Sequence, residues 1–130
     1  MKVEFATKLR VELLDSGPPD RWLTLAPFVV RVDGVPLVVP PEYETNFASV
    51  PRLPLVYLLA GNTAHRSALV HDWLYDARAL DEAGKRFSKD FADDVFYAAM
   101  LAEGVPAWRA SMMYRAVRLA GQGPYAEAPA

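Results

Sequence analysis

The sequence predicts a single α+β domain in which a small N-terminal antiparallel β-sheet with a hairpin precedes a Pro-rich loop and three C-terminal antiparallel helices. Apolar and polar residues alternate with a period of two in the first part of the chain, whereas later apolar residues recur every three or four positions, as in helices. Eleven prolines, mostly in the first half, favour turns and loops there. A length of 130 residues fits one domain. We expect a β part at about 1–40, an ordered loop at about 40–54, a helical part at about 55–121 and a frayed tail at 122–130.

The strand signals come first. Stretches of β-prone residues are, in order, residues 1–14, Trp22–Leu25, Phe28–Val32 and Val35–Val39. The run Ser16–Asp20 interrupts them, and Asp33-Gly34 is a turn pair typical of a hairpin between the last two stretches. Pro36 indicates that the second arm of this hairpin lies at a sheet edge, because proline donates no backbone hydrogen bond. We expect this sheet to support the rest of the chain.

The loop at 40–54 has too many prolines for a helix or a central strand, yet it carries several large apolar residues. It is therefore expected to be ordered and packed on the core, the kind of loop that often carries function. Asn46 and Ser49, with nearby backbone carbonyls, are candidate ligands for a hard cation or hydrogen-bonding groups for a ligand. The alternative is that Thr45 and Asn46 only cap a turn.

Three helices are expected after the loop, at about Ala64–Ala77, from Arg86 or Ser88 to Glu103, and from Pro106 to Gly121. Asn62-Thr63 suits the amino-terminal cap of the first helix. Short links predict that neighbouring helices pack antiparallel. The expected inward residues of the second helix are Phe87, Phe91, Val95, Ala98 or Ala99, and Ala102. Those of the third helix are Trp108, Met112, Met113, Ala116, Val117 and Ala120.

The candidate site lies on the first two helices. His71 and Tyr75 are four residues apart and share a helical face, and Asp72 follows His71. The second helix carries three aspartates, Asp90, Asp93 and Asp94. In an antiparallel pair, one of these aspartates reaches the ring of His71, fixes its tautomer and raises its basicity, but the spacing does not decide which one.

This cluster favours hydrolysis of an ester or amide without a covalent intermediate. His71 would activate a water molecule, and a cation held by Asp72 would polarise the carbonyl; calcium suits carboxylate and carbonyl oxygens. The alternative is that His71 is a satisfied core residue and that the aspartates are solvated or helix-capping charges.

The composition excludes several classes of function. The chain has no cysteine, which rules out a disulfide frame, a zinc–thiolate site and a thiol nucleophile. The net charge of -2, without a block of like charge, gives no nucleic-acid footprint. Charges near Met1 argue against a signal peptide, and no apolar stretch reaches the length of about 20 residues that a transmembrane helix needs. We expect a soluble protein that starts out in the cytoplasm.

Four motifs occur in order: Thr45–Arg52, His71–Tyr75, Ala92–Phe96 with Ala99-Met100, and Tyr114–Arg118 with Gly121. Together they resemble the signature of a family of small phage and prophage proteins of unknown function. For the first three motifs the family pattern reads T-D-F-A-S-V-P-R, H-D-x-L-Y and A-D-x-x-F. The resemblance covers about residues 28–121 and implies a phage origin, with the host cytoplasm or the virion as location. Asn46 stands where the family usually has aspartate, which should weaken any metal site because an amide brings no charge.

The two helices are also similar, more distantly, to the helical core of bacterial secreted phospholipases of the A-two class, over roughly the last 60 residues. This resemblance implies that His71 is the base and Asp72 the calcium ligand. It also implies that Tyr75 and Asp93 orient the histidine, with Asp90 and Asp94 as rivals to Asp93. The Gly-rich calcium loop and the cysteines of such enzymes are absent, so the loop at Asn46 would have to complete the calcium site.

Two functional hypotheses remain open. The first is a phage-encoded, calcium-dependent hydrolase that acts on a lipid ester or a cell-wall amide. The second is a non-enzymatic phage protein, either a virion, tail or assembly component or a host-binding protein. In the second, His71, Asp72, Tyr75 and Asp93 form a buried structural network. Neither hypothesis involves nucleic acid or a transmembrane segment.

Overall fold

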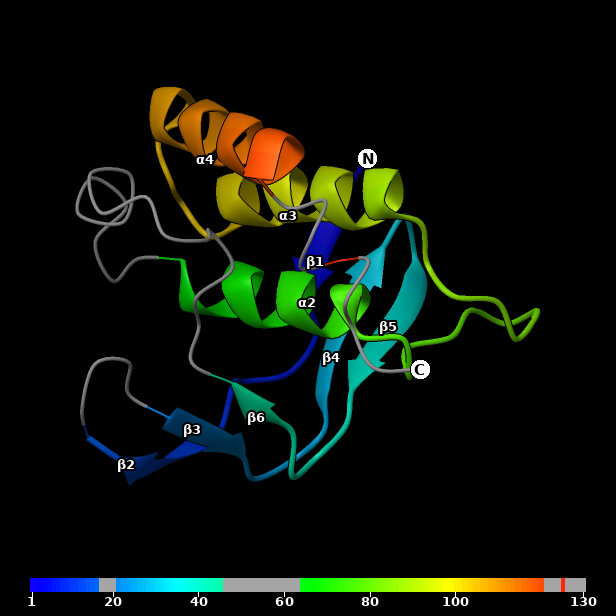
Figure 1. Cartoon of the computed structure of the whole chain (residues 1–130), viewed down its shortest axis with the longest axis vertical. Coiled ribbons are helices and arrows are strands. Elements are labelled where there is room, and N and C mark those ends of the chain that lie inside the picture. The colour runs from blue at the N-terminus through cyan, green and yellow to red at the C-terminus, as the bar shows by residue number, and fades with distance from the viewer. Residues whose placement is uncertain (17–20, 46–63, 121–124, 126–130) are drawn as a thin grey trace.

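The structure, a computed structural model, describes residues 1–16, 21–45, 64–120 and Tyr125. The strands of these ranges lie in two three-stranded antiparallel sheets, and three helices follow (Figure 1). The predicted α+β class is confirmed. The strands are β1 (Val3–Phe5), β2 (Val11–Asp15), β3 (Arg21–Thr24), β4 (Phe28–Val32), β5 (Val35–Val39) and β6 (Glu44–Thr45). The helices are α2 (His65–Tyr75), α3 (Lys89–Ala102) and α4 (Ala107–Ala120).

The sheet that faces the helices has the strand order β1-β4-β5. β4 and β5 form the predicted hairpin, with Val32 opposite Val35. Asp33 and Gly34 have φ angles of 50° and 83°, the left-handed pair that a two-residue hairpin turn requires. Pro36 lies on β5, which is an edge strand of this sheet, as predicted.

The second sheet has the order β2-β3-β6 and lies at one end of the molecule (Figure 1). The alternating stretch 1–14 is therefore not one strand: β1 pairs with β4, whereas β2 pairs with β3. β6 is a two-residue strand at the start of the predicted loop, and it pairs with Trp22 and Leu23. The guanidinium of Arg21 joins Asp15 and Glu44 across this sheet, although exposed ion pairs of this kind contribute little stability.

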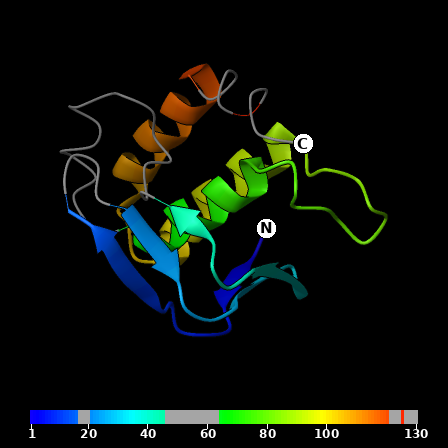
Figure 2. The same cartoon turned by 60° about the horizontal axis from the view of Figure 1, so that its bottom comes forward.

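The helices pack on one face of the first sheet (Figures 1 and 2). The shared core includes Val30 and Phe28 from β4, Leu69 and Leu74 from α2, and Val95 from α3, all nearly fully buried. Glu103 at the end of α3 contacts Ser67 at the start of α2, so these two helices run antiparallel as predicted. α4 packs antiparallel against the other side of α3 and closes a second apolar cluster.

The inward faces of α3 and α4 differ in part from the prediction. On α3, Phe96 and Met100 are fully buried because α4 covers a second side of the helix, whereas Ala102 is exposed. On α4, Trp108 is 54% exposed and Ala110 is fully buried. Two residues correspond to about 200° around a helix, so the register that buries Ala110 turns Trp108 to the opposite side.

The start of α2 is stabilised by a side chain from another helix. The carboxylate of Glu103 accepts hydrogen bonds from the backbone N–H groups of Arg66 and Ser67, each at 3.0 Å, and from the Ser67 hydroxyl at 2.6 Å. A carboxylate at this position satisfies free N–H groups and complements the helix dipole. Ala64 precedes the helix without a side-chain cap, and the predicted cap at 62–63 lies outside the described residues.

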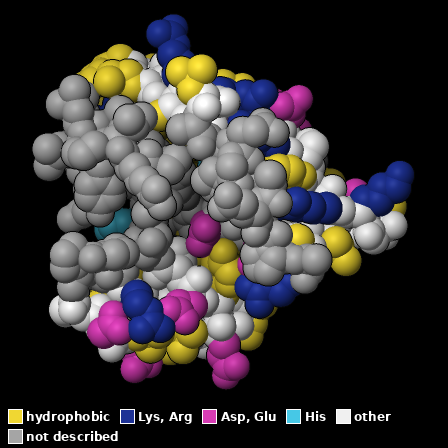
Figure 3. All heavy atoms as spheres, in the orientation of Figure 1, with side chains coloured by type: hydrophobic (Ala, Val, Ile, Leu, Met, Phe, Trp, Pro, Cys, Tyr) yellow, Lys and Arg dark blue, Asp and Glu magenta, His cyan; other side chains and the backbone are white. Residues whose placement is uncertain are grey.

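On the face shown in Figure 3, positive and negative side chains of the described residues are interspersed. This distribution agrees with the small net charge. Within the described ranges, no helix is long and apolar enough to cross a membrane.

Candidate functional site

The centre of the candidate site is a hydrogen-bonded triad between α2 and α3. His71 Nε2 lies 2.7 Å from Asp93 Oδ1, and the Tyr75 hydroxyl donates to the same oxygen at 2.5 Å. The side chains of His71 and Asp93 are 1% and 0% exposed. The helical spacing places His71 and Tyr75 on the face of α2 that meets α3, so a single aspartate of α3 reaches both.

Of the three candidate aspartates, Asp93 is the one that contacts His71. Asp90 is exposed and pairs with Arg118 at 2.8 Å, while Asp94 accepts a hydrogen bond from Tyr114 at 2.9 Å. Both therefore lie toward α4 rather than toward the imidazole.

The second oxygen of Asp93 binds two cations that the sequence analysis missed. Asp93 Oδ2 accepts from Lys89 Nζ at 2.7 Å and from the Arg118 guanidinium at 2.8 Å. Burial alone would raise the pKa of Asp93, but hydrogen bonds from His71, Lys89 and Tyr75 outweigh it and hold that pKa well below its usual range. The carboxylate is therefore ionised at neutral pH. Lys89 lies four residues before Asp93, a helical spacing that signals such a pair.

His71 is a neutral imidazole, and one of its nitrogens has no hydrogen-bond partner among the described residues. Burial lowers the pKa of His71 more than the hydrogen bond and charge of Asp93 raise it, and the charge of Lys89 lowers it further. Because the ionised Asp93 only accepts hydrogen bonds, Nε2 carries the proton and Nδ1 carries the lone pair. Nδ1 is buried and has no hydrogen-bond partner among the residues that the structure describes.

Aromatic rings fix the orientation of His71. The ring of Phe96 stacks on the imidazole with a centroid distance of 4.6 Å, and the Tyr75 ring lies 4.1 Å away on its own helix. These contacts, together with the Asp93 bond, leave the imidazole a single well-defined position.

Asp72 points away from the triad, toward the β-strands. Its Oδ2 accepts a hydrogen bond from the Tyr43 hydroxyl at 2.9 Å, and the side chain of Thr45 also hydrogen-bonds to it. Burial raises the pKa of Asp72, against the opposing effect of these two hydrogen bonds. Tyr43 packs edge-on against Trp73, with 5.2 Å between the ring centroids. Asp72 thus joins α2 to the strand β6 and the residues before it.

The described residues alone do not provide a calcium site. Calcium takes six to eight oxygen ligands, and among the described residues the Asp72 carboxylate has the hydroxyls of Tyr43 and Thr45 beside it. Asp76 is one turn further along, but both of its oxygens bind Arg78. In the described ranges there is no group of three His, Asp or Glu side chains that would hold a metal ion. Asn46 and Ser49 lie outside the described residues, so calcium binding stays a prediction.

A C-terminal tyrosine contacts the triad from the side. Tyr125, which falls in the predicted frayed tail, packs edge-on against Tyr75 with a centroid distance of 5.3 Å. Its hydroxyl donates to the Phe87 carbonyl at 2.6 Å. The guanidinium of Arg86 lies 3.8 Å from the centre of the Tyr125 ring and donates to the carbonyls of Tyr75 and Tyr125. The sequence has no local signal for these contacts, because Tyr125 lies 50 positions from Tyr75 and almost 40 from Arg86 and Phe87.

Comparisons with known proteins give a family and no activity. Neither the curated proteins nor the solved structures contain a match to this chain. Residues 22–117 match a family described as protein of unknown function, DUF1353. The matched region runs from β3 into α4 and includes every residue of the triad. Because this match covers well over half of the chain, the protein belongs to the DUF1353 family.

Proposed function

We propose that the protein is a hydrolase in which Nδ1 of His71 accepts a proton from the water that attacks an ester or amide carbonyl. One observation carries the proposal: in the described residues, the Nε2 side of the imidazole is fully bound while Nδ1 keeps a free lone pair. A structural histidine gains stability by satisfying both nitrogens, whereas a general base must leave one nitrogen free.

The remaining triad residues orient the base. Asp93 holds the Nε2–H tautomer and stabilises the imidazolium that forms as Nδ1 takes the proton. Tyr75 donates to the same carboxylate oxygen and so fixes its position between the two helices. General-base catalysis of this kind accelerates a reaction by about 10²–10⁴-fold.

The substrate class and the cation rest on the resemblances of the sequence. The likeness to phospholipases favours a lipid ester, with a cell-wall amide as the second class, and the phage motifs favour a phage-encoded protein. Asp72, together with Asn46 and Ser49, is the proposed ligand set for calcium. Bound there, calcium would supply Lewis-acid polarisation of the carbonyl.

The test is hydrolysis of phosphatidylcholine vesicles and of a muramyl peptide, with calcium and with a chelator, by the wild type and by His71→Gln. A glutamine amide preserves a donor at the position of Nε2 but offers no basic nitrogen at the position of Nδ1. We expect the wild type to turn over one substrate and the variant to lose about 10²-fold or more in rate, with the fold intact by circular dichroism. Equal rates, or no turnover of either substrate by the wild type, would reject the proposal.

One observation favours the second candidate, a non-enzymatic virion, tail, assembly or host-binding protein. Lys89 and Arg118 place two positive charges on Asp93, so the carboxylate stabilises a developing imidazolium less than an unpaired one would. In this case the network only locks α2, α3 and α4 together. We then expect calorimetry to detect no binding of a divalent ion. His71→Ala should lower the melting temperature, and neither the wild type nor this variant should hydrolyse the two substrates.

A further inference from the structure

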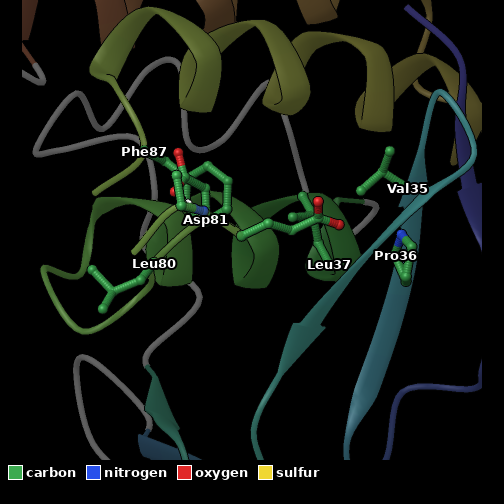
Figure 4. A pocket seen from close by; sticks show the side chains of 8 residues that line it. Val35, Pro36, Leu37, Leu80, Asp81 and Phe87 are labelled. Carbon is green, nitrogen blue, oxygen red and sulfur yellow. Dashed lines mark hydrogen bonds between the residues drawn. The ribbon is translucent and has the colours of Figure 1, made fainter. Parts of the chain in front are cut away.

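A groove separates the edge of β5 from the connection between α2 and α3 (Figure 4). Its volume is ≈ 390 Å³. One wall is formed by Val35, Pro36 and Leu37, and the other by Leu80, Asp81, Glu82, Ala83 and Phe87. The groove lies outside the triad, and none of its lining residues belongs to the proposed active site.

The backbone of β5 offers hydrogen-bonding groups along this edge. In a two-residue hairpin the two residues that flank the turn form backbone hydrogen bonds to each other. Along the strands, hydrogen-bonded pairs then alternate with pairs whose N–H and C=O groups point away from each other. Val32 and Val35 flank the turn, so Leu37 bonds to β4 and Val38 directs its N–H and C=O outward. The carbonyl of Val29, opposite Val38, accepts instead from Ala6 on the far side of β4, which agrees with this pattern. Pro36 also faces outward but has no N–H, so Val38 is the outward donor of β5.

The groove is apolar where the side chains of an additional strand would lie. A new strand would run about 4.8 Å beyond β5, and its inward side chains would continue the row of Val35 and Leu37 into the groove. Leu80 and Val35 are 54% and 48% exposed, so the inward side chains of the new strand would find apolar surface to pack on. Phe87 is half-buried at the opposite wall and would be covered as well.

The charged residues of the groove favour a basic occupant. Asp81 and Glu82 line the wall opposite β5. Oδ1 of Asp81 accepts from two backbone N–H groups of its own turn, while Glu82 is exposed. Lys85 belongs to the same turn but does not line the groove. Every second side chain of an extended peptide points to the same face. A basic side chain two residues after an apolar one would therefore enter the groove beside it and meet these carboxylates.

We propose that β5 and the groove beside it bind an extended segment of a partner protein, which adds to the sheet beside Val38. In this segment an apolar residue and a lysine or arginine two positions away share the face toward the groove. Backbone bonds to Val38 supply affinity, and the groove with its carboxylates supplies specificity, as in other cases of strand addition. The inference is independent of the proposed hydrolase, because it uses neither the triad nor Asp72.

The probe is the fluorescein-labelled hexapeptide Val-Thr-Lys-Thr-Val-Thr, in which valine and lysine share one face of the extended chain. Its binding to the full-length protein is measured by fluorescence anisotropy. Two matched peptides test the two parts of the proposal: one with glutamate in place of lysine, and one N-methylated on the backbone nitrogens that would face β5. We expect saturable binding of the first peptide, and about tenfold or more weaker binding of the other two, equivalent to about 1.4 kcal/mol.

Protein variants locate the binding site. Glu82→Lys should weaken binding of the lysine peptide at least about fivefold, equivalent to roughly 1 kcal/mol. Glu12→Lys makes the same charge change on β2 and should leave the affinity within about twofold, less than roughly 0.5 kcal/mol. Equal losses in both variants, equal binding of the N-methylated peptide, or no saturation up to roughly 1 mM peptide would overturn the proposal. If the protein is a dimer that the peptide dissociates, a second copy occupies this edge, which also overturns it.

Discussion

Asp93→Asn should destabilise the protein strongly although it barely changes the shape of the side chain. The change preserves the shape of the side chain but removes its charge, while two cations, an imidazole N–H and a phenol still point at it. The amide also turns an NH₂ group toward at least one of these donors. Because the side chain is fully buried, water cannot take the place of the lost acceptor.

The expected cost follows from this burial. Removing one partner of a buried, hydrogen-bonded ion pair costs about 3–5 kcal/mol. For a domain of this length, such a loss corresponds to a fall in melting temperature of about 10–20 °C. Asp90→Asn and Asp94→Asn are matched controls on the same helix, because both side chains are exposed; each should cost less than about 1 kcal/mol.

The assay is urea unfolding of the wild type and the three variants, followed by tryptophan fluorescence at several pH values. Although burial opposes it, hydrogen bonding from His71, Lys89 and Tyr75 keeps the pKa of Asp93 below its unfolded value. Its stabilisation is therefore complete above about pH 4 and is lost as the pH falls further. The difference between the wild type and Asp93→Asn should narrow in acid. A cost no larger than that of the two controls would refute the assignment of Asp93 as the buried centre of the network.

Three further predictions concern stability. Burial lowers the pKa of His71 against the opposing effect of Asp93, so the unfolded chain binds a proton on this residue more readily than the folded protein. The free energy of unfolding of the wild type should therefore decrease as the pH falls below about 6.5. Urea titrations of His71→Gln should lack this contribution to the pH dependence. Glu103→Ala removes the acceptor of the free N–H groups of α2 and should cost about 2 kcal/mol by urea unfolding, and no measurable cost would contradict the capping role. Tyr125→Phe should cost about 1 kcal/mol through the lost bond to Phe87, and Tyr125→Ala more in thermal melts, whereas equal melting temperatures for all three proteins would exclude an ordered Tyr125.

Local signals were sufficient for the hairpin and for the order of the helices. Asp33-Gly34 fixes the turn, and Pro36 excludes β5 from the sheet interior, so both features follow from a few adjacent residues. The division of residues 1–14 between two sheets was not predictable in this way. It depends on which distant strand each half pairs with, and period-two alternation is the same in either case.

The candidate site was predictable in its composition but not in its details. Helical spacing brings His71 and Tyr75 together, and antiparallel packing brings an aspartate to them. The choice of Asp93 over its neighbours depends on the rotation of α3, which α4 fixes by packing on the other side. The same long-range packing explains why Trp108 is exposed where an inward position was expected.

The protonation state of His71 is the most direct test of this account, because the proposed function needs a basic Nδ1. The chain has two histidines, so ¹⁵N-labelled imidazole signals can be assigned by comparing the wild type with His71→Gln. Long-range ¹H–¹⁵N correlation spectra at neutral pH should show His71 with a protonated Nε2 and an unprotonated Nδ1. A proton on Nδ1, or a doubly protonated ring at that pH, would contradict the account.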